Sequence, residues 1–145
     1  MLINKKGNIW NTEMDNLCIP VNLLGVMGKG LALQAKKQCP GLFNSYKKFC
    51  DRGEIDIGYN VYWESSDYPK GILLLATKID WRYPSRVEYV KEGLIHFAES
   101  YEKWGIKSIA FPRLGCGAGG LDWINVEPLF TQIIKPLPID IEIYQ

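Results

Sequence analysis

The sequence predicts an α/β protein, a three-layer α/β/α sandwich with a central mixed sheet. Short apolar runs typical of buried strands alternate along the chain with longer segments of helical spacing. The run at 71–77 is apolar almost throughout, as expected for a strand that is covered on both faces. The chain has 145 residues, of which 47% are hydrophobic, so we expect a single domain over residues 1–145 with a sizeable core.

The first half of the chain is predicted to contain three strands and two helices. In order, these are an edge strand at 1–6, a buried strand at 17–21, helices at 28–39 and 41–53, and a strand at 59–64. Pro20 has no backbone N–H to donate, so we expect the second strand to end or bulge there. Pro40 and Gly53 mark the ends of the two helices.

The second half continues the same alternation. It is predicted to form strand 71–77, helix 84–105, strand 106–112, helix 124–135 and a final strand at 139–145. Pro84 suits the first turn of the long helix, whose apolar residues recur at helical spacing. The last strand alternates apolar and polar residues. His96, the single histidine, falls within the long helix, where we expect a packing role.

Composition excludes several classes of protein. The net charge is +1, so no global basic field attracts nucleic acid, although a local basic strip remains open. The four cysteines contain no C-x-x-C pair, so we expect no metal site and reduced thiols. The N-terminus has no apolar signal region, and no apolar run reaches the roughly 18 residues of a membrane span. We therefore expect a cytoplasmic monomer that binds no membrane.

Two glycine-rich loops follow buried strands, at 21–34 and 111–123, and each precedes a predicted helix. Glycine lets backbone N–H groups converge on one point, and a helix N-terminus adds partial positive charge. Since ligands of such sheets lie beyond the carboxyl ends of the strands, two such loops predict a ligand that carries a diphosphate. Glycine-rich turns are also common without any ligand. Neither loop fits the Walker A or dinucleotide-binding pattern, which disfavours an ATPase and an NAD dehydrogenase.

Three stretches resemble macrodomains: VNLLGVMGKG at 21–30, TKIDWRYPS at 77–85 and GCGAGGLDW at 115–123. The resemblance covers nearly the whole chain. It is strongest to the branch of DarG-type DNA ADP-ribosyl glycohydrolases and the terminal ADP-ribose protein glycohydrolase. It implies a macrodomain fold and a pocket for ADP-ribose, which serves as ligand or product, with no further cofactor.

The resemblance also implies roles for individual residues. Asn8 stands where many macrodomains place an aspartate that holds the adenine amino group, and Ile9 would line the adenine slot. Asn22 would contact the distal ribose, as a candidate catalytic residue. Further ligand contacts are implied at Gly28, Lys29, Gly30, Leu31 and Thr77. The diphosphate would be held by backbone N–H groups of Leu114, Gly115, Cys116, Gly117, Ala118, Gly119, Gly120 and Leu121, without thiol chemistry.

Lys78 is the main catalytic candidate. It ends an apolar strand, so its stem lies beside buried surface while its amine reaches the predicted pocket. In the enzymes that the chain resembles, a lysine after this threonine does the work. It would either attack the anomeric carbon as a neutral amine or stabilise the opened sugar and the leaving group. A solvated lysine at a strand end is the alternative without function.

The second loop departs from the protein-directed enzyme, which pairs its lysine with an aspartate where this chain has Gly119. The pattern is more similar to the DarG-type loop, which implies ADP-ribose on a thymine base in DNA. DarG-type proteins carry further chain that binds a toxin. Because this chain ends at its last predicted strand, we expect it to act by removing the modification.

The strip at 78–86 combines cations with aromatic side chains, a combination suited to single-stranded nucleic acid. We expect Trp81, Arg82 and Arg86 to contact nucleic acid. In the alternative interpretation the strip is only the start of a helix, with Trp81 packed inward. The leading hypothesis is a hydrolase that removes ADP-ribose from thymidine in single-stranded DNA. The alternatives are a non-catalytic ADP-ribose reader, an ADP-ribose-1''-phosphate phosphatase and a protein ADP-ribosyl hydrolase.

Overall fold

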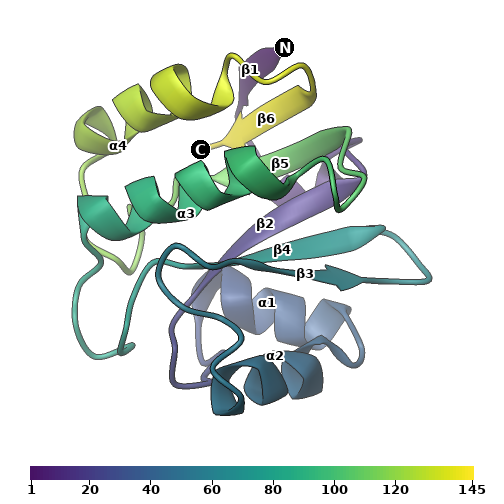
Figure 1. Ribbon diagram of the computed structural model, residues 1–145, viewed down its shortest axis with the longest axis vertical. Coiled ribbons are helices and arrows are strands. Elements are labelled where there is room, and N and C mark those ends of the chain that lie inside the picture. The colour runs from purple at the N-terminus through teal and green to yellow at the C-terminus, as the bar shows by residue number, and fades with distance from the viewer.

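The computed structural model describes residues 1–145 and contains one six-stranded sheet of order β1-β6-β5-β2-β4-β3 (Figure 1). The strands are β1 (Leu2–Lys5), β2 (Asn16–Val21), β3 (Val61–Glu64), β4 (Gly71–Ala76), β5 (Ser108–Pro112) and β6 (Asp140–Tyr144). All neighbouring pairs are parallel except β3 and β4, which pair in antiparallel fashion. The mixed sheet predicted from the sequence is therefore confirmed.

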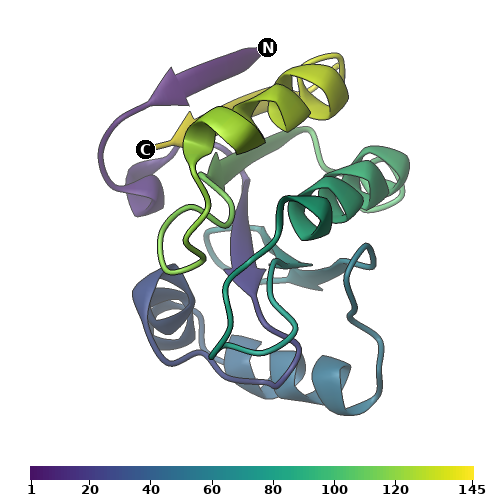
Figure 2. The same ribbon diagram turned by 90° about the vertical axis from the view of Figure 1, so that its left-hand side faces the viewer.

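Helices cover both faces of this sheet (Figures 1 and 2). On one face, α1 (Gly30–Gln38) and α2 (Leu42–Asp51) cover β2, β3 and β4, and the short 3-10 helix η1 (Ile9–Asn11) lies against β5. On the other, α3 (Val87–Ser100), α4 (Trp123–Leu129) and the π-helical turn η2 (Phe130–Ile134) pack against β4, β5 and β6. These three layers are the predicted sandwich.

Strand β4 shows why the apolar run at 71–77 is needed. Ile72 and Leu74 lie in the core under α1 and α2, whereas Leu73 and Leu75 lie in the core under α3, and all four are fully buried. On the α3 side, a Cβ on Gly93 would lie 2.7 Å from Leu75, so this glycine lets the helix approach the strand closely. The prediction that both faces of the strand are covered is confirmed.

Pro20 lies where strand pairing changes. Strand β2 pairs with β4 from Asn16 to Val21, but it pairs with β5 only at Asn16 and Leu17. The proline therefore stands after the ladder to β5 has ended, although β2 itself continues to Val21 without a bulge. Beyond Leu17 the two strands separate, and this separation opens the floor of the site described below.

The structure corrects two sequence-based expectations. The long helix begins at Val87 and ends at Ser100, and Pro84 lies in the preceding loop. The last strand does not alternate between core and solvent, because Glu142 is 6% exposed. Its carboxylate accepts hydrogen bonds from the hydroxyls of Thr12 and Tyr144, and Lys5 lies 3.4 Å away. The segment around η1 covers this side of β6, so the alternating sequence here does not report an exposed face. No helix of the structure combines the length and apolar character needed to span a membrane.

Candidate functional site

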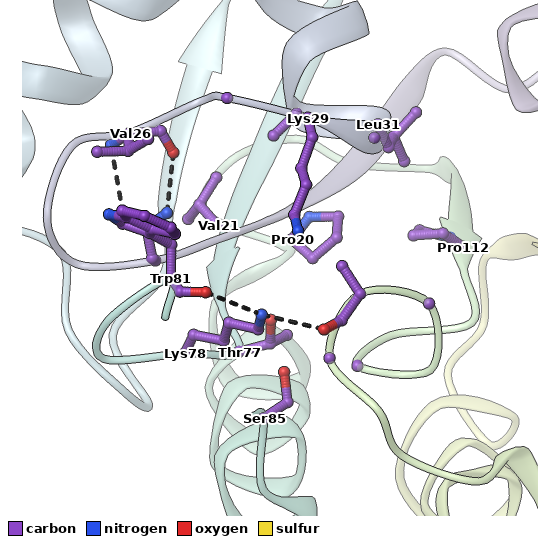
Figure 3. A pocket seen from close by; sticks show the side chains of 18 of the residues that line it. Pro20, Val21, Val26, Lys29, Leu31, Thr77, Lys78, Trp81, Ser85 and Pro112 are labelled. Carbon is purple, nitrogen blue, oxygen red and sulfur yellow. Dashed lines mark hydrogen bonds between the residues drawn. The ribbon is translucent and has the colours of Figure 1, made fainter. Parts of the chain in front are cut away.

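The predicted glycine-rich loops meet at the carboxyl ends of β2, β4 and β5. Between them lies a cavity of about 480 Å³, the first cavity, lined by Asn22, residues 28–32, Thr77, Lys78 and the loop that follows β5 (Figure 3). Figure 2 shows the loop after β5 beside α1. A second cavity of about 680 Å³ is lined by Asn8, Ile9 and Trp123, among others. The two share Pro112, Arg113 and Gly117, so together they form one elongated site.

The first loop delivers a helix N-terminus to the first cavity. Gly30, the first residue of α1, has a φ of 61°, in the left-handed region that favours glycine. Lys29 occupies the N-cap position without a side-chain hydrogen bond to the helix, and residues 28–32 all line the cavity. The uncapped N–H groups of the first turn therefore present partial positive charge to a ligand.

Asn22 holds the shape of the first loop. Its Oδ1 accepts from the backbone N–H groups of Leu24 at 3.0 Å and Val26 at 3.3 Å, and its Nδ2 donates to the carbonyl of Val26 at 2.8 Å. From α2, the hydroxyl of Tyr46 donates to the Asn22 carbonyl at 2.6 Å, and burial raises the pKa of this phenol. One Nδ2 hydrogen remains for a ligand, so the contact predicted for Asn22 stays a prediction.

The second loop offers free backbone donors. Gly115 and Gly120 adopt φ values of 77° and 79°, and the N–H of Leu121 donates to the Gly115 carbonyl at 2.9 Å. This turn leaves the consecutive N–H groups of residues 117–119 without a protein acceptor. Such a run of free donors is a typical anion site. The side chain of Leu114 is fully buried in the core beneath the loop, so only its backbone is available to a ligand.

Cys116 in this loop is half-buried, and its thiol donates to the Leu114 carbonyl at 3.5 Å. Burial raises the pKa of the thiol, which keeps it protonated at neutral pH. Both observations agree with a role for the loop backbone alone, without thiol chemistry.

Lys78 joins the end of β4 to the second loop. Its Nζ donates to the carbonyl of Ala118 at 3.1 Å and to the carbonyl of Trp81 at 3.4 Å (Figure 3). Two of the three hydrogens of an ammonium are used in this way, and the third remains for a ligand in the first cavity. The two contacts fix the direction of the amine within the cavity.

The two acidic side chains nearest in sequence to these motifs do not serve Lys78. Asp80 forms a two-pronged ion pair with Arg82, with Nε to Oδ1 at 3.0 Å and a terminal nitrogen to Oδ2 at 2.5 Å. The hydrogen bonds from Arg82 lower the pKa of Asp80 to about 2. Asp122 occupies the N-cap position of α4 and lines the second cavity, away from Lys78.

Gly119 leaves no room for a side chain. A Cβ at this position would lie 2.3 Å from the carbonyl oxygen of Gly115 and 2.4 Å from the hydroxyl of Ser85. The backbone N–H of Ser85 also donates to the Gly119 carbonyl at 3.0 Å, which holds the two segments together. In this loop conformation an acidic residue therefore does not fit at position 119.

The strip at 78–86 divides into two parts. Trp81 is 47% exposed and lines the first cavity, so the alternative in which it packs inward is wrong. Arg82 and Arg86 are exposed but line neither cavity. Arg82 is held by Asp80, and the guanidinium of Arg86 lies 5.9 Å from the ring centre of Tyr89. Their predicted contact with nucleic acid stays a prediction, and it would lie outside the cavity.

The second cavity holds the residues predicted for adenine. Asn8 caps η1, because its Oδ1 accepts from the Trp10 N–H at 3.0 Å, and Ile9 is buried beside it. Arg113 stands at the junction of both cavities with its guanidinium 4.9 Å from the ring centre of Trp123. This places a cation between the predicted adenine region and the second loop.

Most of the residues predicted for the site line one of the two cavities; those that do not are Leu114, Gly120, Arg82 and Arg86. Sequence reasoning missed Ser85, which lies inside a stretch that carries the resemblance to macrodomains, and Arg113, which lies in the glycine-rich segment at 111–123. A polar or charged residue within such a stretch was the available signal. It also missed Pro20 and Pro112, at the ends of the two strands that separate.

The fold and the site define a class: an α/β/α domain with a cavity between two glycine-rich loops at the carboxyl ends of its strands. The chain belongs to the macrodomain family, because a family model for the Macro domain matches residues 19–130.

Comparison with individual proteins indicates which macrodomains the chain is similar to. The chain is 40% identical over 147 residues to the DNA ADP-ribosyl glycohydrolase of Mycobacterium tuberculosis, an alignment that covers 99% of this chain and 42% of that protein. The solved macrodomain of M. tuberculosis DarG is 38% identical and superimposes with a TM-score of 0.94, covering 99% of this chain and 97% of the other. Thermosipho africanus DarTG, solved in complex with ADP-ribose, is 33% identical with a TM-score of 0.91, covering 98% of this chain and 41% of the other. The chain thus spans about two fifths of the length of the curated relative.

Proposed function

We propose that this protein binds ADP-ribose and removes it from DNA, with ADP-ribosyl-thymidine in single-stranded DNA as the substrate. The observation that carries the proposal is the position of Lys78, whose amine lies in the first cavity and is fixed against the second loop by Ala118. The relative named DNA ADP-ribosyl glycohydrolase, whose alignment covers 99% of this chain, supports the same activity.

The shape of the site suits ADP-ribose. Adenine fits the second cavity beside Asn8 and Ile9, and the diphosphate fits along the second loop, from Arg113 at the junction to the free N–H groups of residues 117–119. The distal ribose then falls in the first cavity, between the start of α1 and Lys78. Free N–H groups from both loops face this path, and Arg113 supplies a positive charge at the junction of the two cavities. The similar structure with ADP-ribose bound supports this ligand.

The reaction is hydrolysis of the bond between the anomeric carbon of the distal ribose and the modified base. As this bond breaks, its electron pair moves to the base, water supplies a hydroxyl to the carbon, and a proton goes to the base. The Lys78 ammonium, held by two carbonyl groups, is placed to stabilise the negative charge that develops on the base or on the opened sugar. This role needs no free amine and therefore agrees with the hydrogen bonds observed.

Two features favour DNA over protein as the carrier of the modification. Gly119 excludes an acidic side chain from the second loop in this conformation. Trp81 is 47% exposed at the first cavity, and Tyr83, 64% exposed, follows two residues later. Exposed aromatic rings next to a cavity suit unpaired bases, since one base–aromatic stack contributes about 1–3 kcal/mol.

The test is a gel assay on an oligonucleotide that carries ADP-ribosyl-thymidine, together with calorimetry of ADP-ribose binding. We expect cleavage by the wild type and by Lys91→Ala, which removes an exposed lysine of α3 as the matched control. Lys78→Ala is expected to bind ADP-ribose without cleaving the oligonucleotide. If the wild type binds ADP-ribose without cleaving the oligonucleotide, the proposed hydrolase activity is wrong and the protein is a reader. If it does not bind ADP-ribose, the proposed ligand is wrong.

A further inference from the structure

Ser85 carries a buried hydroxyl with no partner inside the protein. Its exposed fraction is 4%, and its Oγ forms no hydrogen bond with any protein atom. One other buried side-chain atom shares this condition, the Oδ1 of Asn60, which lines neither cavity. A buried hydroxyl without a hydrogen-bond partner lowers the stability of the folded state, so such groups usually bind a water, an ion or a ligand.

The position of this hydroxyl is set by the second loop. The backbone N–H of Ser85 donates to the Gly119 carbonyl at 3.0 Å, which fixes the segment before α3 against the loop after β5. Ser85 lines the first cavity, and Figure 3 shows its oxygen pointing towards Thr77 and Lys78. The unpartnered group therefore faces the ligand region rather than the core.

Gly119 and Ser85 are fitted to each other. The Oγ of Ser85 would lie 2.4 Å from a Cβ at position 119, so the hydroxyl occupies space that a side chain of the second loop would otherwise enter. The free N–H groups of residues 117–119 belong to the same loop, in which Gly119 packs against this oxygen. A hydroxyl added to a row of backbone donors extends an anion site by one more donor.

We infer that Ser85 is a ligand-binding residue, whose hydroxyl donates a hydrogen bond to a phosphate oxygen of the ligand. The inference rests on the proposed function for the identity of that ligand, ADP-ribose. It assigns to the segment before α3 a phosphate contact, whereas the sequence-based prediction placed the diphosphate contacts in the second loop. Ser85 thereby supplies the polar side-chain contact that position 119 has no room to make.

The test is Ser85→Ala, measured by calorimetry with ADP-ribose and with ADP and by thermal unfolding of the ligand-free protein. We expect affinity for both ligands to fall about tenfold, or about 1.4 kcal/mol, as for loss of one hydrogen bond to a charged group. The melting temperature should stay unchanged or rise, because the variant removes a buried hydroxyl that has no protein partner.

Ser100→Ala is the matched control. Ser100 is also 4% exposed, but its hydroxyl lies 3.4 Å from His96 Nε2 on α3 and it lines neither cavity. We expect this variant to bind both ligands as the wild type does.

Each other result has a definite meaning. Equal affinity of Ser85→Ala and wild type would overturn the inference. A fall in affinity for ADP-ribose alone would move the contact to the distal ribose and overturn the phosphate assignment. A melting temperature that falls together with the affinity would give Ser85 a structural role instead. If the wild type binds neither ligand, the proposed function fails first, and independently of Ser85.

Discussion

The amine of Lys78 lies 3.1 Å from the carbonyl oxygen of Ala118, which fastens the segment after β4 to the middle of the second glycine-rich loop. A second contact, from the same amine to the Trp81 carbonyl at 3.4 Å, fixes the direction of the side chain. The group proposed to act on the substrate is therefore positioned before any ligand arrives. A charge that is fixed in advance stabilises a transition state without the cost of reorienting it.

The first prediction concerns the charge of Lys78. If the amine acts as a cation, Lys78→Ala should lower the rate of cleavage by about 100-fold or more, as for loss of one preorganised donor. The wild-type rate should stay flat between about pH 7 and about pH 9. Single-turnover assays with the modified oligonucleotide measure both quantities. A rate that climbs steadily over this range would show instead that the neutral amine attacks the sugar.

The second prediction concerns the crowded glycine of the second loop. Gly119→Ala should destabilise the ligand-free protein by about 1–3 kcal/mol, the usual range for overpacking. The added Cβ would meet Gly115 and Ser85 at less than 2.5 Å, so the loop has to move. Denaturant unfolding measures the change. Gly117→Ala is the matched control, since a Cβ there has no neighbour within 4 Å and should cost under about 0.5 kcal/mol. Similar losses for both variants would contradict the steric argument.

The third prediction concerns the ion pair of Asp80 and Arg82. Because Arg82 lowers the pKa of Asp80 to about 2, the pair favours the folded state above the unfolded pKa of about 3.9, and this contribution is lost as pH falls through about 2. Carboxyl NMR titration measures the pKa directly. In Arg82→Ala the pKa of Asp80 should rise towards its ordinary value. An unchanged pKa in the variant would mean that another group holds the carboxylate.

The fourth prediction separates strand binding from ligand binding. Trp81→Ala should weaken binding of the modified single strand by about 1–3 kcal/mol, the contribution of one stacked base. Its effect on free ADP-ribose should be smaller, because the exposed ring lies at one side of the first cavity. Fluorescence anisotropy with labelled strands measures the first quantity and calorimetry the second. Tyr59→Ala removes an exposed aromatic ring that lines neither cavity and should leave both unchanged.

Local patterns in the sequence were sufficient for the layers of the fold and for both loops. The apolar run of β4 required cover on both faces, and glycines after two buried strands required a ligand or a tight turn. Burial of Glu142 was not predictable in the same way. The Thr12 hydroxyl, which donates a hydrogen bond to the Glu142 carboxylate, lies 130 residues away along the chain. Pro84 suits either a first helical turn or the loop before it, and only the contact of Ser85 with Gly119 fixes the latter.

The site was predictable in its backbone and less so in its side chains. Glycine spacing identifies where N–H groups converge, which located most of the cavity lining. Whether a hydroxyl such as that of Ser85 finds a partner depends on how two distant segments pack, and no local pattern records it. For the same reason, the sequence did not indicate that Asp80 holds the guanidinium of Arg82, and the contact of Arg82 with nucleic acid stays a prediction.

The segment from Lys78 to Ser85 is fastened to the second loop at both of its ends, by the Lys78 amine on Ala118 and by the Ser85 N–H on Gly119. Both ends of the segment are therefore bound to neighbouring residues of the second loop, and Trp81 lies between these ends. We expect a ligand that displaces Ala118 and Gly119 to shift this segment as well, because both of its ends are bound to them. Under the proposed function, we therefore expect occupancy of the first cavity and contact between Trp81 and the DNA strand to depend on each other.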